Sequence, residues 1–364
     1  VAMRTTGLGG DSDVRLQEGL DRGLTLGPRR VMPMGLAAQM YPDLVHLALD
    51  QALAQATPAV DGGYIVIPLW GTPPQGRDPR EGAIITRLLA GPLRYGQVVT
   101  TRLEAPALSR LITQGAVMLA GVTPSDAAHV LGLVAAWDSA AAIKALTVFA
   151  RKRTGGGDQL APDAATLAQM IVDQLTVQTV DCLLDAAFAE DGRDWDVAPE
   201  QLTRHPLAQA GLDRHHDVIA TTLKLGVPVI GLGASAATYY GAVGARLHTK
   251  MLLPNHADVA NAIGAVVGQV AMRARGVVTS AGAGQFSVHL TSGVQHEADQ
   301  DAAMALLESH LTKQVTQQAQ AAGVEDIHIS VVRDIETATI EDQPVFLEAT
   351  LQVTAQGRPR IASG

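Results

Sequence analysis

Two glycine-rich loops carry the residue types in this sequence that are best suited to binding an anion. The first, TTGLGGDSD, spans residues 5–13, and the second, GLGAS, spans residues 231–235. Glycine lets a ligand approach the backbone, and N–H groups in such loops and at helix starts attract phosphate or carboxylate groups. In the first loop, Asp11 and Asp13 add carboxylates that could hold a divalent metal ion or position a water molecule. The same residues also fit a tight turn with capping acids, so both interpretations stay open.

The segment DRHHD, residues 213–217, is a second candidate for chemistry. It is the only tight cluster of histidines and acids in the sequence. Imidazole and carboxylate groups are ligands for divalent metals, and the cluster offers Asp213, His215, His216 and Asp217. Adjacent histidines point to different faces of a helix or a strand, so a shared ion requires an irregular loop here.

The second glycine loop lies between a predicted strand and a predicted helix. Residues 227–230, VPVI, form a short apolar run that favours a buried strand, and small residues with two tyrosines after Ser235 favour a helix. A further helix is predicted with Asn255 as its N-cap. Its apolar face is predicted to consist of Val259, Ile263, Val266 and Val267. We therefore expect two helices to flank a glycine-lined pocket.

The first glycine loop leads into a predicted β-hairpin, whose strands cover residues 14–16 and 24–26 around the segment EGLDRG. Helical periodicity follows over residues 34–56, and the run YIVIPLW, residues 64–70, predicts a short buried strand. The loop GTPPQGRDPR, residues 71–80, is rich in proline and glycine, and it is a natural place for an insertion to begin.

From residue 78 to about residue 190 the pattern is mostly helical. Within this range, residues 117–119 predict a short strand. Thr123 is the predicted N-cap of the helix that follows, with Asp126 three residues on, as in a capping box. A long amphipathic helix is expected over residues 162–190. Helix, turn, strand and helix also suggest a winged-helix DNA reader, but the acidic chain argues against it.

Composition excludes several classes of protein. The chain has 364 residues, 47% hydrophobic and 17% charged, which describes a globular protein. Aromatic residues make up only 3%, so the core must consist of Ala, Leu and Val, which favours close helix packing. A net charge of −9 argues against a nucleic-acid partner. The single cysteine, Cys182, fits a reducing compartment, and no run of 18 apolar residues exists. We expect a cytoplasmic protein without a membrane span.

The chain is predicted to be an α/β protein in four segments, because the pattern changes again after residue 273. Strands and one long helix are expected beyond that point, including a half-exposed antiparallel strand over residues 345–353. The segments are a first α/β part (1–75), a mostly helical insertion (76–190), a second α/β part (191–273) and a small α+β C-terminal domain (274–364).

The second loop can also be compared with the dinucleotide-binding fingerprint. Residues 229–236 have the form GxGxxA after an apolar strand. A Rossmann site would require an acid at the end of the next strand, but residues 251–254 read MLLP. The Rossmann interpretation is therefore weak.

Five segments in order resemble the hydantoinase/oxoprolinase family, the ATP-dependent hydantoinase A type. They are TTGLGGDSDVRL, LGPRRVMPMGLAAQMYP, GVTPSDAAHVLG, VIGLGAS and HADVANAIGAVVG, and they span about residues 4–270. The tail, residues 277–360 with FSVHL and GRPR, resembles the C-terminal domain of that family. The resemblance implies a lobe of the actin-like ATPase fold that sugar kinases, heat-shock chaperones and actin share.

The resemblance also implies a reaction. Family members are thought to use ATP to phosphorylate the carbonyl oxygen of a cyclic amide, of the hydantoin or 5-oxoproline type, so that water can open the ring. ATP and Mg²⁺ are the implied cofactors. Asp11 is the implied catalytic residue, acting through Mg²⁺ or an ordered water molecule. The implied nucleotide-binding residues are Gly9 and Gly10 near the phosphates, and Gly231, Gly233, Ala234 and Ser235 at the nucleoside.

The family pattern further implies partners for this chain. Its members begin with an N-terminal lobe that carries an Asp-Ile-Gly-Gly-Thr-like phosphate motif, followed by a second such motif, and neither is present here. We therefore expect a C-terminal portion that is inactive alone and that works with the missing N-terminal lobe, with a hydantoinase B type subunit, or in a homo- or hetero-oligomer. Related subunits carboxylate acetone. The alternatives are a non-catalytic nucleotide- or partner-binding lobe, and a kinase for a small hydroxylated substrate.

Overall fold

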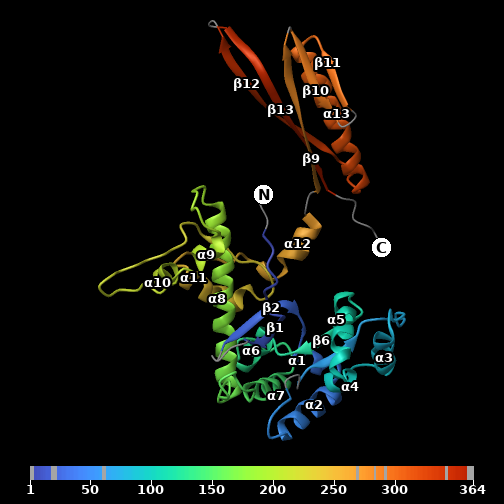
Figure 1. The fold of residues 1–364 in the computed structure, drawn as a ribbon, viewed down its shortest axis with the longest axis vertical. Coiled ribbons are helices and arrows are strands. Elements are labelled where there is room, and N and C mark those ends of the chain that lie inside the picture. The colour runs from blue at the N-terminus through green and yellow to red at the C-terminus, as the bar shows by residue number, and fades with distance from the viewer. Residues whose placement is uncertain are drawn as a thin grey trace. The chain divides into compact units, whose positions relative to one another are not determined.

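The structure is a computed structural model, and it describes residues 4–17, 23–59, 63–267, 270–282, 284–290, 293–340 and 343–358. The fold is mixed α/β, and it divides into two compact units, Val1–Asp258 and Val259–Gly364 (Figure 1). The boundaries expected after residues 75 and 190 fall inside the first unit. The second unit begins before the expected start at residue 274.

The hairpin predicted after the first glycine loop is confirmed. Strand β1 (Ser12–Leu16) pairs antiparallel with β2 (Leu24–Arg30), and its register shifts between Ser12 and Val14. The turn of the hairpin, residues 18–22, lies outside the described residues.

A four-stranded sheet begins just after the hairpin in the sequence, and its strand order is β3-β6-β4-β5. Its strands are β3 (Met32–Pro33), β6 (Val117–Gly121), β4 (Ile65–Pro68) and β5 (Leu93–Arg94). Strand β6 pairs parallel with β3 and antiparallel with β4. The segment expected as a helical insertion therefore contributes a central strand to the sheet that the first segment begins.

The helices of the first unit are mostly short. They are α1 (Met34–Met40), α2 (Pro42–Ala54), α3 (Pro79–Arg87), η1 (Leu88–Ala90), α4 (Tyr95–Val98), η2 (Arg102–Glu104), α5 (Ala105–Thr113), α6 (Pro124–Val130), α7 (Ser139–Ala150), α8 (Ala164–Glu190), α9 (Pro199–Thr203), α10 (Pro206–Leu212) and α11 (Ala236–Arg246). The helix predicted over residues 34–56 is two helices, because Pro42 lacks an N–H and starts a new one. The long predicted helix is α8, and Asp163 caps it by accepting the Thr166 N–H at 2.7 Å.

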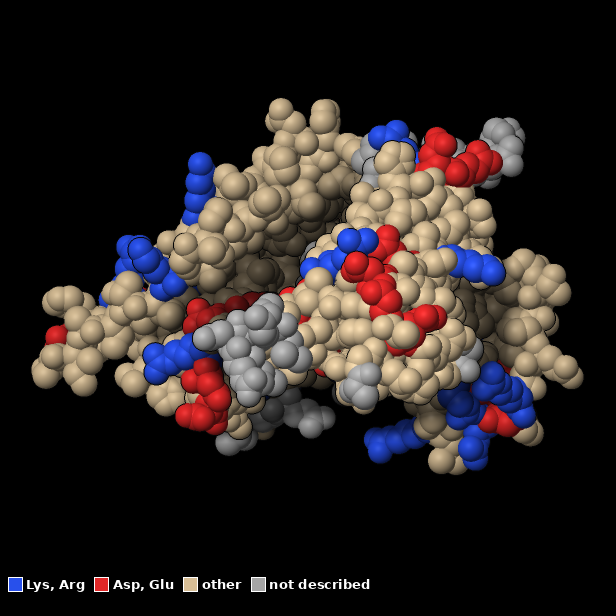
Figure 2. Space-filling model, turned by 90° about the horizontal axis from the view of Figure 1, so that it is seen from above, with Lys and Arg blue, Asp and Glu red and all other residues tan. Residues whose placement is uncertain are grey.

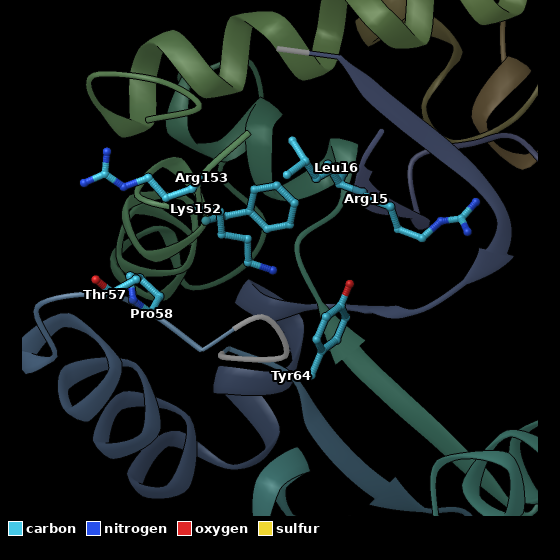
Figure 3. Close-up of a pocket in the computed structure, with 9 residues that line it drawn as sticks. Arg15, Leu16, Thr57, Pro58, Tyr64, Lys152 and Arg153 are labelled. Atoms are coloured by element: carbon cyan, nitrogen blue, oxygen red, sulfur yellow. The ribbon is translucent and has the colours of Figure 1, made fainter. Parts of the chain in front are cut away.

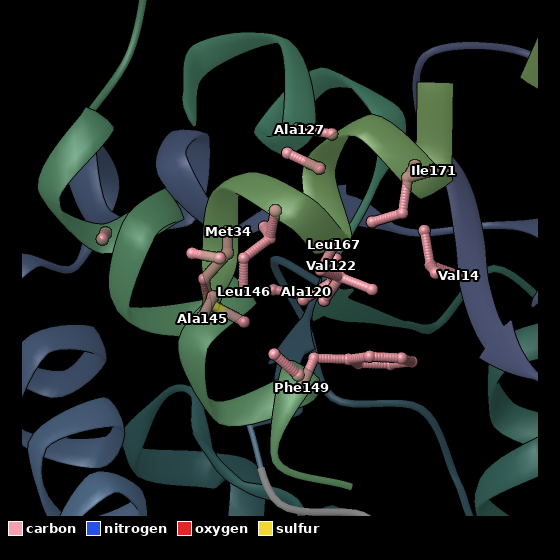
Figure 4. Close-up of a cluster of buried hydrophobic side chains, with 14 of the residues drawn as sticks. Val14, Met34, Ala120, Val122, Ala127, Ala145, Leu146, Phe149, Leu167 and Ile171 are labelled. Carbon is pink, nitrogen blue, oxygen red and sulfur yellow. The ribbon is translucent and has the colours of Figure 1, made fainter. Parts of the chain in front are cut away.

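The main core of the first unit is built largely from alanine and aliphatic residues on α6, α7 and α8 (Figure 4). Its fully buried members include Met34, Ala120, Ala127, Leu146 and Leu167. Alanine has little side chain beyond its Cβ atom, so the helices and the sheet pack closely, as the composition predicts.

The second unit is a five-stranded antiparallel sheet with one helix on it (Figure 1). The strand order is β11 (Gly293–Glu297), β10 (Gln285–Leu290), β9 (Val270–Gly282), β13 (Gln343–Gly357) and β12 (His328–Ile340). Helix α13 (Gln300–Ala321) packs on the sheet through Leu307 and Leu311. Leu351 and Val353 are buried while Gln352 is exposed, which confirms the predicted alternation for this end of the strand. At the other end the prediction is wrong, because Phe346 is buried and Leu347 is 48% exposed, where the pairing of β13 with β12 shifts its register. The last two residues of GRPR lie outside the described residues.

The strand before the second glycine loop differs from its prediction. Strand β7 (Val229–Ile230) pairs only with β8 (Met251–Leu252), in a parallel two-stranded sheet. Val227 is 61% exposed and Ile230 is 62% exposed, so the prediction of a buried strand is wrong. A two-stranded sheet has too little surface to bury both faces of so short a strand.

The helix predicted at Asn255 also begins later than expected. A 3₁₀ turn, η3 (Ala257–Val259), precedes α12 (Ala260–Val267), so Asn255 does not cap α12. Val259 and Ile263 are exposed, and the side chains of Val266 and Val267 lie outside the described residues. Helix α12 belongs wholly to the second unit, so a pocket between α11 and α12 stays a prediction.

Candidate functional site

The first glycine loop closes on itself just before β1. Ser12 donates its N–H to the Gly9 carbonyl oxygen at 3.1 Å, and the Ser12 Oγ accepts the Gly9 N–H at 2.9 Å. The Gly10 carbonyl oxygen accepts the N–H of Ser125 at 2.9 Å, which ties the loop to the first turn of α6. The Gly9 N–H is therefore committed within the loop, and Gly10 is the glycine of this loop that meets a distant part of the chain.

Asp11 forms an ion pair with Arg30, the last residue of β2. The Asp11 Oδ2 accepts from Arg30 Nε at 2.7 Å and lies 2.6 Å from Arg30 Nη2. The hydrogen bond that Arg30 donates to Asp11, together with the negative charge of Asp11, raises the pKa of Arg30. A metal ion or a water molecule at Asp11 would compete with this guanidinium. The hairpin register, which sets Arg30 opposite Ser12, is the signal from which sequence reasoning could have found the pair.

Asp13 is buried and has two strong donors. Its Oδ2 accepts from Arg29 Nε at 3.0 Å, and its Oδ1 accepts from the Tyr64 hydroxyl at 2.8 Å. Burial raises the pKa of Tyr64, and the Asp13 charge raises it further. Burial lowers the pKa of Arg29, but attraction to Asp13 outweighs burial and leaves that pKa raised. Asp13 is therefore a structural acceptor under the hairpin, and its hydrogen bonds leave little capacity for the metal ion suggested by the sequence.

The second glycine loop joins β7 to α11. Gly231 donates its N–H to the Leu252 carbonyl oxygen at 2.9 Å, and Gly233 donates to the Ala257 carbonyl oxygen at 2.7 Å. Ser235 is the N-cap residue of α11, but its side chain makes no cap hydrogen bond. The N–H groups of the two glycines are thus held within the protein, and the start of α11 lacks a side-chain cap.

The two glycines of this loop are required for different reasons. A Cβ atom at Gly231 would lie 2.4 Å from the Tyr240 ring and 2.7 Å from Leu253, so packing excludes a side chain there. Gly233 has a φ of 111°, and a Cβ atom there would have no neighbour within 4 Å. Gly231 therefore serves packing, whereas Gly233 serves the backbone conformation and has open space where a side chain would be.

Ser125 brings the two glycine loops together. A Cβ atom at Gly10 would lie 2.7 Å from Ser125 Oγ and 3.8 Å from Ser235 Cβ. The Tyr239 hydroxyl, on the first turns of α11, donates to the Pro124 carbonyl oxygen at 2.9 Å. Burial raises the pKa of Tyr239 to about 12. Segments more than 100 residues apart thus meet at Gly10, and the predicted phosphate loop lies beside the predicted nucleoside loop.

Asp126 holds the start of α6 in place. Its carboxylate accepts the N–H and the hydroxyl of Thr123 at 3.0 and 2.8 Å, and Thr123 Oγ1 accepts the Asp126 N–H, which confirms the predicted capping box. The same carboxylate accepts the N–H groups of Met34 and Gly35, at the start of α1, at 3.0 and 2.8 Å. Burial raises the pKa of Asp126 against these hydrogen bonds. The Asp126 carboxylate therefore holds the first turns of α1 and α6 in place, and Ser125 lies in the first turn of α6.

The DRHHD cluster does not form a metal centre. Its four predicted ligands are exposed, and Asp213 pairs with Arg246 at 2.9 Å. Among the residues that the structure describes, no group of three or more His, Cys, Asp or Glu side chains is arranged to hold a metal ion. The irregular loop that a shared ion requires is present, but its side chains are not grouped around a common point.

Charges on the surface are mixed. On the face drawn in Figure 2, lysine and arginine side chains form separate groups, and several of these groups have aspartate or glutamate beside them. None of the described helices is both long enough and apolar enough to span a membrane.

Comparisons with protein-family models, with curated proteins and with solved structures find no match to this chain.

Proposed function

We propose that this chain is one lobe of an actin-like ATPase and that it belongs to a hydrolase that opens a cyclic amide at the expense of ATP. The substrate class is a hydantoin or a 5-oxoproline. The observation that carries the proposal is the meeting of the two glycine loops, where a Cβ atom at Gly10 would lie 3.8 Å from Ser235 Cβ. The proposal requires both loops to lie at one site, and their approach at Gly10 and Ser235 supports this.

The residues at the meeting point have separate roles in this proposal. Gly10 lets the first loop pack closely against Ser125, since a Cβ atom at Gly10 would lie only 2.7 Å from the Ser125 Oγ. Gly233 has no neighbour within 4 Å of the position of a side chain, which leaves space for a flat nucleoside. The start of α11 carries the positive end of the helix dipole, which favours an anionic group near Ser235. ATP itself would supply the phosphoryl group that makes the amide carbon open to attack by water.

The two acids of the first glycine loop do not fit a resident Mg²⁺ site. Asp11 is paired with Arg30, and Asp13 is buried against Arg29 and Tyr64. We therefore assign Mg²⁺ no ligand among the described residues and no step in the reaction. Asp11 keeps a simpler role in the proposal, in which it orients Arg30 at the edge of the first loop.

Calorimetry with ATP tests the nucleotide site. Val at Gly233 requires a φ of 111°, which a branched residue rarely adopts, and it would also fill the open position. Gly91 is a matched control, since its φ is 122° and a Cβ atom there also has no neighbour within 4 Å. We expect Gly233→Val to abolish ATP binding and Gly91→Val to leave it unchanged. Equal affinities in both variants, or no binding by the unmodified chain, would overturn the proposal.

A second candidate function is a non-catalytic nucleotide- or partner-binding lobe. It is favoured by the first loop, where the Gly9 N–H is committed to Ser12 and the Asp11 carboxylate to Arg30. The two functions differ in one assay, in which ATP-dependent ring opening is measured for the chain combined with a lobe that carries the phosphate motifs. Ring opening that Gly233→Val abolishes supports the hydrolase. ATP binding without ring opening supports the non-catalytic lobe, and a hydantoinase B type subunit is then the partner to add.

A further inference from the structure

One edge of the sheet in the second unit is a long strand. Among the described residues, β12 pairs with β13 and with no other strand, and it ends the strand order at that edge (Figure 1). The strand at the opposite edge, β11, has 5 residues, whereas β12 has 13. An edge strand presents a row of backbone N–H and C=O groups that can pair with a further strand. Strand β12 is therefore a long template for strand addition.

Apolar side chains are exposed on β12. Val332 is 62% exposed, and Ile329 and Ile335 are exposed as well. Helix α13 packs mainly on β9, β10 and β13, so it leaves β12 largely uncovered. Natural edge strands are often protected by lysine or proline, and the range His328–Glu336 contains neither. Exposed apolar residues along such an edge are typical of an interaction surface.

The range His328–Glu336 is the regular part of β12, because the pairing with β13 shifts its register directly after Glu336. In a regular strand alternate side chains share a face. Arg333 lies on the face that carries α13, since it donates to Glu308 of that helix at 3.1 Å. The odd-numbered residues of the range therefore lie on this face, and the even-numbered residues lie on the other.

This range is complementary to itself when it pairs antiparallel about Val332. In that register Val332 lies opposite its own copy, Ile329 lies opposite Ile335, and His328 lies opposite Glu336. Each pair joins two residues of the same face, as one continuous sheet requires. Apolar cross-strand pairs, and an imidazole opposite a carboxylate, stabilise such a pairing. A second copy of this chain therefore fits the edge.

Charge excludes the registers on one side of this one. A pairing about Arg333 would set two guanidinium groups opposite each other, and a pairing about Asp334 would set two carboxylates opposite each other. Like charges directly opposite destabilise a strand pair. A pairing about Val331 would shorten the paired stretch and set Ile329 opposite Arg333. The side chains of β12 thus favour the register about Val332.

We propose that two copies of this chain associate through β12, which pairs antiparallel with β12 of the second copy about a two-fold axis at Val332. The two five-stranded sheets then form one continuous sheet. A two-fold pairing occupies the β12 edge of both copies, so this contact closes at a dimer. The interface uses only residues of the second unit, so it depends neither on the nucleotide site nor on the cavity in the first unit that Figure 3 shows beside Tyr64.

Sedimentation equilibrium of the full chain tests the interface. Val332→Lys sets two like charges opposite each other at the two-fold axis, and it changes a side chain that the core does not bury. The matched control is Val294→Lys on β11, an exposed valine at the opposite edge of the same sheet. We expect the unmodified chain to dimerise and Val332→Lys to raise the dimer Kd about fivefold or more. Val294→Lys should leave the Kd unchanged.

An exchange of charges tests the register. His328→Glu sets two glutamates opposite each other, and Glu336→Lys removes the carboxylate that faces His328, so each single variant should weaken the dimer. The double variant His328→Glu/Glu336→Lys restores a pair of opposite charges and should dimerise more tightly than either single variant. The proposal is overturned if the unmodified chain stays a monomer, as it would if another segment of the same chain covered β12. It is also overturned if Val332→Lys and Val294→Lys have equal Kd values, or if the double variant restores nothing.

Discussion

Replacing Asp126 by alanine tests how the site is held together. The variant leaves three buried backbone N–H groups, those of Met34, Gly35 and Thr123, without their acceptor. Each orphaned buried donor costs about 1–3 kcal/mol, so the gross loss is about 3 kcal/mol or more. The variant also no longer has to desolvate a buried carboxylate, which offsets part of this loss. We therefore expect a net loss of stability of about 3 kcal/mol. At about 2–4 °C per kcal/mol for a unit of this size, the melting temperature should fall by about 6–12 °C.

The assay is thermal and urea unfolding followed by far-ultraviolet circular dichroism. Asp126→Asn should lie closer to Asp126→Ala than to the unmodified chain, because an amide NH₂ cannot accept the N–H groups that face it. The matched control is Asp163→Ala, since Asp163 caps α8 through one N–H at an exposed helix start, where its loss should matter much less. The reasoning fails if the melting temperature of Asp126→Ala stays within about 2 °C of the unmodified chain, or if it equals that of the control.

Three further predictions concern stability. Hydrogen bonds from Arg87 and from the Thr100 backbone lower the pKa of Glu104 from 4.5 to about 2, so its contribution is present above pH 4.5 and disappears as the pH falls toward 2. The stability difference between the unmodified chain and Glu104→Gln should therefore shrink between pH 5 and pH 2 in urea titrations, and a constant difference would contradict this. Leu167→Ala, in the fully buried core, should cost about 2–5 kcal/mol in urea unfolding, whereas the exposed Leu207→Ala should change stability by less than about 0.5 kcal/mol. Tyr64→Phe removes a donor from buried Asp13 and should cost about 1–2 kcal/mol; unchanged stability would show that the bond is dispensable.

Local patterns in the sequence predicted the features that depend on near neighbours. The hairpin over β1 and β2, the cap at Thr123 with Asp126, and helix α8 each follow from residues a few positions apart. The hydrogen bonds that Met34 and Gly35 donate to Asp126 could not be predicted in this way. These residues are about 90 positions away from Asp126 in the sequence, and no periodic pattern indicates such a contact. Strand β6 likewise lies in a helical stretch, and only pairing with β3 and β4 shows its place.

The positions of the two loops of the candidate site could be predicted from the sequence, but their hydrogen bonds and ion pairs could not. Glycine spacing located both loops, but the commitment of the Gly9 N–H to Ser12 and of Asp11 to Arg30 depends on how the hairpin folds back.

Amide hydrogen exchange with ATP and Mg²⁺ tests most directly whether the two glycine loops form one nucleotide site. Peptides that cover residues 9–12 and residues 231–236 should both exchange more slowly when ATP is added, because a ligand between the loops shields both backbones. A peptide that covers α3, residues 79–87, should not change. Slowing at both loops, lost in Gly233→Val, is the result that the account predicts. Slowing at only one loop, or at neither, would contradict it.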